Sequence, residues 1–305
     1  MKQPRIISLG EVLWDLFPDG ERFGGAPANV ACHSAMLGGN VTLVSAVGND
    51  KRGRDAIGIL KEFGIDTSLV QVDSEQPTGT VGVELAAVGK PCFTIDEDSA
   101  WDHLAWTPEL TSKIAEANAI YFGTLGQRGI ASRATILRAL DAAQAASVLR
   151  ILDVNLRAPF FSPELIREFV EHADVLKLSD DELDHVAHAC SISGAQDDVS
   201  ILRSIAKRFK LRSIVMTRGA DGALFVSADN IVEQPGIPAN IVDTVGAGDS
   251  FTARLLVGLL RGEEAEPLLR EACELASAVC AQAGAIPTPS QIGKNASPRI
   301  LTNKF

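Results

Sequence analysis

Apolar residues along the chain fall into short runs of strand length that alternate with longer stretches at helical spacing. We predict strands at residues 6–9, 12–17, 41–47, 80–88, 92–96, 119–122, 150–153, 175–178, 213–217 and 223–226. We predict helices at residues 28–37, 54–63, 132–145, 163–171, 180–189, 199–209, 250–260 and 266–283. Strands separated by helices form βαβ units, which build a parallel sheet with helices on both faces. The pattern therefore predicts an α/β fold.

Two segments, about 11–24 and 78–103, are rich in strand signals and contain no predicted helix. Gly89-Lys90-Pro91 separates two apolar runs in the second segment and is typical of a hairpin turn. We expect both segments to pair into a small extra sheet beside the main body.

The composition of the chain argues against some classes of binding partner. Hydrophobic residues make up 46% of the 305 residues, which is enough for a large core, and the net charge is −11. An acidic chain argues against nucleic acid or an anionic membrane as the main partner. It does not exclude a phosphate ligand, because phosphate sites are local and often consist of backbone N–H groups.

The lack of a recognisable targeting signal and the pattern of cysteines both favour a cytoplasmic location. Met1 to Arg5 is polar, the apolar run after it is too short for a signal peptide, and no stretch reaches membrane-span length. The five cysteines are odd in number and lack zinc-site spacing, so we expect free thiols in a reducing compartment.

The segment Asp243-Thr-Val-Gly-Ala-Gly-Asp249 carries the strongest chemical signal, because an amphipathic helix follows it. Glycines allow close approach of a ligand, and the N–H groups of a helix N-terminus favour an anion. A carboxylate at Asp249 is suited to accept a proton from an alcohol while those N–H groups hold a phosphoryl group. The alternative is a helix-capping Asp.

Two other glycine-rich interpretations fail. A dinucleotide fingerprint needs glycine where Phe251 stands, and a P-loop needs Gly-Lys-Ser/Thr, which is absent from the sequence.

This segment closely resembles the C-terminal signature of the ribokinase-like (PfkB) carbohydrate kinases. Other motifs of that family occur elsewhere in the chain, in the family's order. They are Gly24-Gly25-Ala-Pro-Ala-Asn29, Val47-Gly-Asn-Asp50, Thr217-Arg-Gly219-Ala-Asp-Gly222 and Ala285 to Pro289. The resemblance covers about residues 5–290. It implies a single ribokinase-like domain, residues 1–305, with a three-layer α/β/α sandwich, a mostly parallel central sheet and a small β-sheet lid. It also implies that Gly246, Ala247 and Gly248 form an anion hole and that Asp249 is the catalytic base.

The opening Gly10-Glu-Val-Leu-Trp-Asp15-Leu-Phe-Pro18 resembles bacterial and plant fructokinases, as does Ala100 to His103. The resemblance implies sugar contacts from Asp15, Gly24, Gly25, Asn29, Phe93 and Asn155. It also implies that Arg157 contacts either the transferring phosphoryl group or an anionic end of the substrate. A carboxylate has two acceptor oxygens, which suits a vicinal diol. The alternatives are an exposed lid-strand Asp15, a lid-core Phe93 and a surface Arg157 paired with Glu164 or Glu168. We favour fructose over 2-keto-3-deoxygluconate.

The resemblance also implies ATP and Mg²⁺, and K⁺ as a further cofactor. The implied nucleotide contacts are Lys177, Ser179, Thr217, Gly219, Gly222, Ala276 and Cys280, with Ser179 where many members carry Asn. Glu182 is expected to hold Mg²⁺ through water, and Asp243, Gly284 and Thr288 to surround a monovalent cation. Ser179 to Glu182 is also typical of a helix N-terminus.

Other assignments remain open. The chain is compatible with a catalytically silent sugar- or nucleotide-binding regulator, against which Asp249 and the intact glycine turn argue. A dinucleotide-dependent oxidoreductase lacks its fingerprint. The apolar surface of the lid strands makes a lid-to-lid homodimer the expected assembly.

Overall fold

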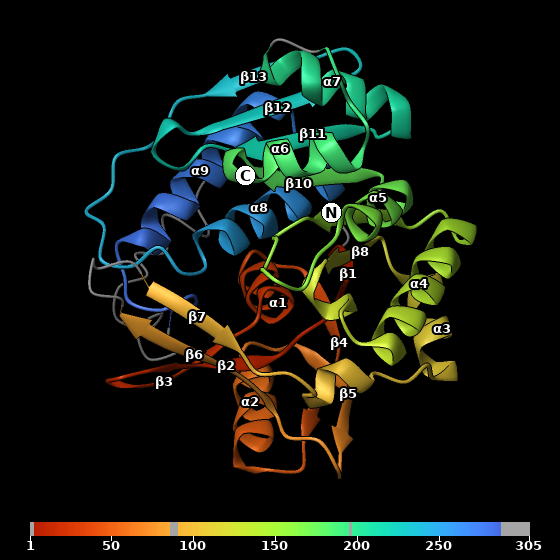
Figure 1. The fold of residues 1–305 in the computed structure, drawn as a ribbon, viewed down its shortest axis with the longest axis vertical. Coiled ribbons are helices and arrows are strands. Elements are labelled where there is room, and N and C mark those ends of the chain that lie inside the picture. The colour runs from red at the N-terminus through yellow and green to blue at the C-terminus, as the bar shows by residue number, and fades with distance from the viewer. Residues whose placement is uncertain (1–2, 86–90, 195–196, 288–305) are drawn as a thin grey trace.

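A computed structural model describes residues 3–85, 91–194 and 197–287. Two sheets and the helices around the larger one make up the fold (Figure 1). The main sheet has nine strands in the order β13-β12-β11-β10-β9-β8-β1-β4-β5, all parallel except for the antiparallel pairings of β11 with β12 and β12 with β13. Their bounds are β1 Arg5–Leu9, β4 Asn40–Gly48, β5 Asp66–Asp73, β8 Ala119–Gly123, β9 Leu149–Asp153, β10 Val175–Ser179, β11 Ser213–Thr217, β12 Ala223–Ser227 and β13 Ile231–Gln234.

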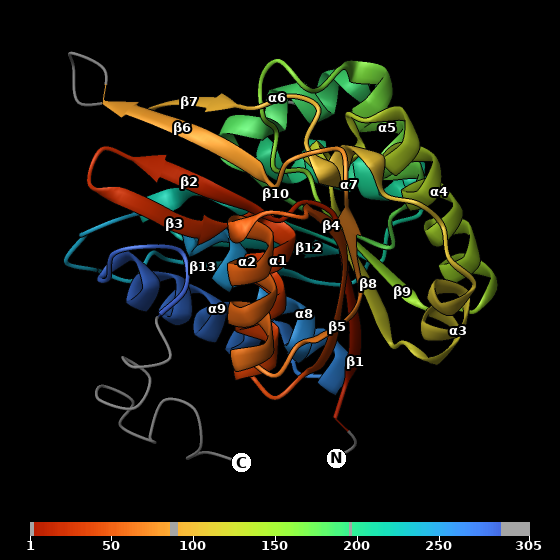
Figure 2. The same cartoon turned by 90° about the horizontal axis from the view of Figure 1, so that it is seen from below.

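Helices cover both faces of this sheet and give three layers (Figure 2). One face packs α1 Ala26–Met36, α2 Lys51–Glu62, α8 Ala247–Arg261 and α9 Ala265–Cys280. The other packs α3 Pro108–Glu116, α4 Ile130–Ala145, α5 Pro163–His172, α6 Asp180–Ala189 and α7 Asp198–Phe209.

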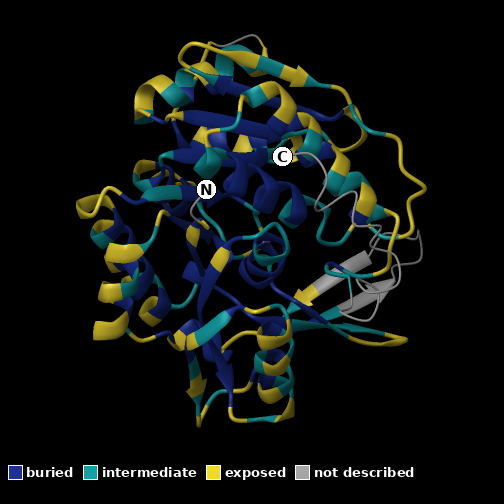
Figure 3. Ribbon diagram, turned by 180° about the vertical axis from the view of Figure 1, so that it is seen from behind, coloured by how far each residue is buried: buried dark blue, intermediate teal, exposed yellow. Residues whose placement is uncertain are grey.

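The core is split by the sheet because successive strand side chains point to opposite faces. Ile6 packs with the α1 and α8 side, whereas its neighbour Ile7 packs with the α3 and α4 side. The strands are largely buried, whereas the outward turns of the helices are exposed (Figure 3). Two apolar faces explain why the strands form continuous apolar runs in the sequence.

A smaller sheet has the order β3-β2-β6-β7 and follows directly from the carboxyl ends of β1 and β5. Its strands are β2 Leu13–Phe17, β3 Gly20–Gly24, β6 Gly79–Leu85 and β7 Pro91–Ile95, with β2 and β6 parallel. It arises from the two strand-rich segments, and its role as a lid stays a prediction. The Gly89-Lys90 part of the expected hairpin lies outside the described residues.

The predicted fold class is confirmed, although several elements were not predicted. They are β3, β5, β13 and α3. Two of them lie at the edges of the main sheet, where half-exposed strands carry polar residues and lack a continuous apolar run. Helix α9 ends at Cys280 and not at the predicted Ala283.

Candidate active site

The glycine-rich turn leads directly into α8. Gly246 has φ 79°, a left-handed conformation, and a methyl group placed on it would lie 2.5 Å from the Ala285 Cα atom. Only glycine adopts this φ without strain and also leaves the space that Ala285 occupies. Helix α8 begins at Ala247, so Asp249 lies in its first turn, where the N–H groups have no intrahelical acceptors. The turn and the helix dipole therefore form a site suited to an anion.

Asn29 joins this turn from α1. Its Nδ2 donates to Asp249 Oδ2 at 2.8 Å, and its own Oδ1 is buried without a hydrogen-bond partner in the described chain. Gly24 and Gly25 precede α1. Gly25 has φ 103°, and a side chain there would also meet the Glu11 carbonyl at 2.7 Å. The structure thus brings the N-terminal glycine motif against the C-terminal one across the carboxyl ends of the parallel strands.

Asp15 approaches the same place from β2. A methyl group placed on Gly24 would lie 2.7 Å from Asp15 Oδ2, so this glycine gives the carboxylate its space. Burial raises the pKa of Asp15 from its ordinary 3.8 to about 6, while Arg157 opposes the rise and Asp249 adds to it. The charges of Arg157 and Asp249 therefore lie close enough to Asp15 to act on its ionisation.

Asn155 and Arg157 lie in the loop after β9. Asn155 has φ 40°, and the N–H of Leu156 donates to Glu182 Oε1 at 2.6 Å. Arg157 is exposed, and its Nη1 donates to the Leu156 carbonyl at 3.2 Å. Among the described contacts it pairs with neither Glu164 nor Glu168, since Glu168 accepts from Arg133 at 2.5 Å. Arg157 is thus available to a ligand.

Glu182 connects this loop to α6 by hydrogen bonds. Its Oε2 accepts the N–H of Ser179, the N-cap residue, at 2.7 Å, while its Oε1 holds Leu156. The helix N-terminus predicted at Ser179 is present. Each carboxylate oxygen has a second lone pair, so Glu182 still has acceptor capacity for a metal-bound water.

Lys177 lies at the centre of the site, on β10. It is 6% exposed, and its Nζ lies 3.2 Å from Asp153 Oδ1. A methyl group placed on Gly248 would lie 3.5 Å from the same Nζ. The ammonium therefore borders the anion-binding turn of α8.

The remaining predicted nucleotide residues lie further along the same edge. Thr217 ends β11, and Gly222 has φ 96°, with the Gln234 carbonyl filling the place of a side chain. Ala276 and Cys280 are half-buried on α9, and the Cys280 carbonyl accepts the N–H of Val242 at 2.9 Å. The structure places these residues at two margins of the site, near the ends of β11 and α9.

Asp243 links the glycine-rich turn to the tail. Its Oδ1 accepts the N–H of Val245 and its Oδ2 that of Gly284, each at 3.0 Å. Thr288 lies outside the described residues, as does the side chain of Phe93, whose backbone pairs with Val83 in β7. Over residues 3–85, 91–194 and 197–287 there is no cluster of three or more His, Cys, Asp or Glu with metal-site geometry.

Sequence reasoning assigned no role to four buried polar residues near Asp249: Glu11, His33, Asp153 and Thr252. Burial raises the pKa of Glu11 from its ordinary 4.5 to about 7, and its Oε2 is without a partner in the described chain. His33 Nε2 lies 2.9 Å from the Ala285 carbonyl. Glu11 interrupts an apolar run after β1, and His33 follows Asn29 by one helical turn, so both had a weak signal in the sequence.

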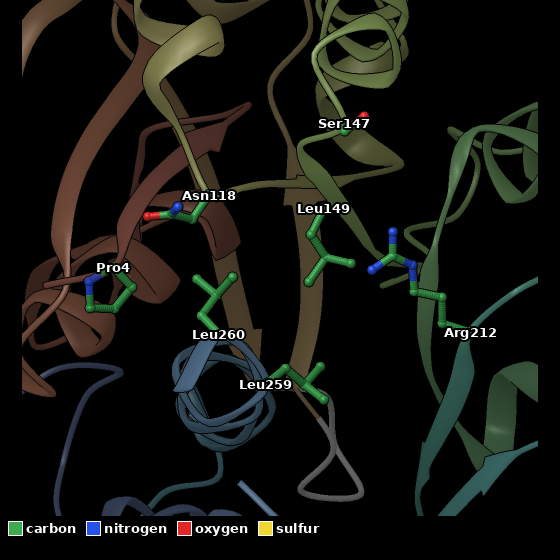
Figure 4. A pocket seen from close by; sticks show the side chains of 7 residues that line it. All are labelled: Pro4, Asn118, Ser147, Leu149, Arg212, Leu259 and Leu260. Carbon is green, nitrogen blue, oxygen red and sulfur yellow. The ribbon is translucent and has the colours of Figure 1, made fainter. Parts of the chain in front are cut away.

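A pocket of about 410 Å³ lies at the opposite, amino-terminal edge of the parallel strands (Figure 4). Its lining residues are Pro4, Asn118, Ser147, Leu149, Arg212, Leu259 and Leu260. None of them belongs to the predicted site. In the described part of the chain, no helix has the length and apolar character required to cross a membrane.

Comparisons with known proteins identify the family. Residues 18–291 match the pfkB family carbohydrate kinases. A fructokinase of Klebsiella pneumoniae is 33% identical over 265 residues, 84% of each chain. An aminoimidazole riboside kinase of Salmonella typhimurium is 30% identical over 309 residues, 94% of this chain and 93% of that one.

The fold is shared with solved structures. The structure of a fructokinase from Xylella fastidiosa with bound ATP superposes with a TM-score of 0.81 at 21% identity, covering 95% of this chain and 97% of that one. The chain therefore belongs to the pfkB family of carbohydrate kinases, and it is an ATP-dependent carbohydrate kinase.

Proposed function

We propose that this kinase transfers the γ-phosphoryl group of ATP to a hydroxyl group of fructose. The observation that carries the proposal is the contact of Asn29 with Asp249 at the start of α8, with Asp15 beside it. Polar side chains from α1 and α8 meet at the anion-binding turn, and Asp15 on β2 lies beside Gly24, close to the start of α1. A polyol bound by Asp15 and Asn29 would present a hydroxyl to Asp249.

In the proposed step, Asp249 accepts the proton of the sugar hydroxyl as its oxygen bonds to the γ-phosphorus. The bond between the γ-phosphorus and the bridging oxygen breaks, and ADP leaves with that electron pair. The N–H groups of the Gly246–Asp249 turn stabilise the negative charge in transfer. Arg157 and Lys177 add positive charge, Arg157 from the exposed loop and Lys177 from the buried strand β10.

We assign Mg²⁺ to the acidic first turn of α6, where Glu182 retains acceptor capacity for a metal-bound water. The ion would neutralise charge on the ATP phosphates. We assign a monovalent cation, K⁺, to the loop held together by Asp243 and Gly284. The Asp243 carboxylate would supply oxygen ligands there, and the turn would supply carbonyl groups. Ser179, Thr217, Gly219, Gly222, Ala276 and Cys280 would border the nucleotide.

Glycines at Gly24-Gly25 connect the small sheet to α1, so this sheet would close over the sugar as a lid and exclude water. Two such sheets, one from each copy, would form a homodimer. Free thiols at Cys32, Cys190, Cys273 and Cys280 and the use of ATP favour the cytoplasm.

The test is ADP release with ATP, Mg²⁺ and K⁺ over fructose, 2-keto-3-deoxygluconate, ribose, tagatose, mannose and adenosine. Turnover on fructose above all others supports the proposal. Turnover on 2-keto-3-deoxygluconate or a riboside alone keeps the mechanism and replaces the substrate. ATP binding without turnover on any of them would indicate a regulator instead.

A further inference from the structure

The proposed function gives no role to Asp153, a buried carboxylate close to the anion-binding turn. Asp153 ends β9 and is 1% exposed, directly beneath the first turn of α8. Its two oxygens face different partners. Oδ1 forms an ion pair with Lys177 Nζ at 3.2 Å, although the angles do not meet the criteria for a hydrogen bond. Oδ2 accepts from the Thr252 hydroxyl at 3.0 Å.

Thr252 continues this contact into the anion-binding turn. Its hydroxyl lies 2.8 Å from the Gly248 carbonyl as well as 3.0 Å from Asp153, so it bridges the two acceptors and donates to one at a time. Thr252 is fully buried. Asp153 is thus linked to the Gly248 carbonyl through the hydroxyl of Thr252, and its ion-pair partner Lys177 lies beside the open face of Gly248.

Lys177 has unused donor capacity. An ammonium has three N–H groups, and the described chain offers Lys177 Asp153 alone as a close side-chain partner. A buried ammonium is stable only where a carboxylate compensates its charge. The ammonium nitrogen lies 3.5 Å from the position that a methyl group on Gly248 would take, so its other N–H groups could reach a phosphoryl group bound at this turn.

We propose that Asp153 is a positioning residue for phosphoryl transfer, which holds the Lys177 ammonium at the anion-binding turn and fixes that turn through Thr252. The inference rests on the proposed phosphoryl-transfer function. Asp153 does not touch substrate in this arrangement. It acts through Lys177 and through α8. Its negative charge keeps the buried Lys177 protonated, which burial alone would disfavour.

The electrostatics agree with this arrangement. Burial by itself lowers the pKa of Lys177, but the Asp153 and Glu182 carboxylates outweigh it and raise the pKa above its ordinary value. The groups that face the pair are Glu182 from α6, Asp249 from α8 and Tyr121 from β8. Loss of the Asp153 charge removes the largest attraction on Lys177, which then deprotonates at lower pH.

Asp153→Asn is the first variant, with Asp174→Asn as its matched control. Asp174 accepts from Arg150 through both carboxylate oxygens, at the amino-terminal end of the same strands and far from the site. Both variants remove a partly or fully buried ion pair from β9 and β10. We expect Asp153→Asn to lower kcat about tenfold to a hundredfold and Asp174→Asn to leave it within about twofold.

Three further readouts separate positioning from general destabilisation. The alkaline limb of the pH–rate profile should move to lower pH in Asp153→Asn only. In a Lys177→Met background, Asp153→Asn should cost less than in the wild type, because the two residues act as a unit. Thr252→Val should lower kcat several-fold, and Thr252→Ser should restore it.

Binding of a non-hydrolysable ATP analogue, measured by calorimetry, is independent of sugar turnover. Asp153→Asn should weaken it about tenfold and Asp174→Asn should not. This comparison tests Asp153 even if no sugar in the panel is phosphorylated. Equal kcat, pH profile and analogue affinity in the two variants, at equal thermal stability, would overturn the proposal.

Discussion

Asn29 and Asp249 lie 220 residues apart in sequence, and the amide of Asn29 donates to the Asp249 carboxylate at 2.8 Å. One residue comes from the first helix and the other from the eighth. The same amide was predicted to bind sugar, so it has two functions in the proposed site. It orients the base, and its unpartnered Oδ1 remains an acceptor.

Replacement of Asn29 should therefore affect binding and chemistry together. We expect Asn29→Ala to raise the KM for sugar and to lower kcat about tenfold, since the base loses its orienting donor. Asn29→Asp should be more harmful, because it places a second carboxylate beside Asp249. Steady-state kinetics on the active sugar checks both, and an Asn29→Asp variant as active as Asn29→Ala would contradict the assignment.

Asp249→Asn should lower kcat by about 10²- to 10⁴-fold, because an amide cannot accept the hydroxyl proton. The contact with Asn29 can persist through the new carbonyl oxygen, so the fold and sugar affinity should stay near those of the wild type. Thermal unfolding and sugar binding by calorimetry provide the controls. Turnover near the wild-type level would exclude Asp249 as the base.

Asp15→Ala should raise the KM for sugar at least tenfold and change the KM for ATP little, because Asp15 lies on the small sheet, away from the proposed nucleotide residues. The matched control is Asp19→Ala in the same segment, since Asp19 is exposed and pairs with Arg22 at the surface. An equal KM for sugar in the two variants would remove Asp15 from the sugar site.

Gly246→Ala should abolish activity and destabilise the protein by about 1–3 kcal/mol, because φ is 79° and the new methyl group would meet Ala285 at 2.5 Å. Gly262→Ala is a matched control at the other end of α8, with φ 71° and open space around the new methyl group. It should cost about 1 kcal/mol of stability and little activity. Denaturant unfolding and kinetics of both variants separate backbone strain from the clash with the tail.

Glu11 should make stability fall as pH rises. Its pKa is about 7 in the folded protein and 4.5 as an ordinary value, so the folded state binds more protons between these limits. The free energy of unfolding should therefore decrease from about pH 4.5 to pH 7, by up to roughly 3 kcal/mol from this group.

Glu11→Gln cannot ionise and should flatten that part of the curve. The measurement is urea unfolding of both proteins at pH 5, 6, 7 and 8. Since Asp15 and Asp153 also titrate with raised pKa values, only the difference between wild type and Glu11→Gln reports on Glu11. Parallel pH dependences would show that Glu11 is not the group responsible.

The sequence by itself determined the fold class and the chemical motif. Alternation of apolar runs with helical patterns is local, and so is the rule that glycine must occupy the turn at Gly246, so both could be predicted before any contact was known. The same holds for Ser179 as the N-cap of α6, which depends on residues within one turn.

Only the tertiary structure decided which groups meet. The pairing of Asn29 with Asp249, the double role of Glu182 and the buried ion pair of Asp153 with Lys177 each join separate elements. Edge strands such as β5 were missed because their neighbours, and not their composition, make them strands. Hydrogen bonds and charge compensation depend on distance in space, and a parallel sheet brings distant strand ends to one edge, so no local pattern encodes these contacts.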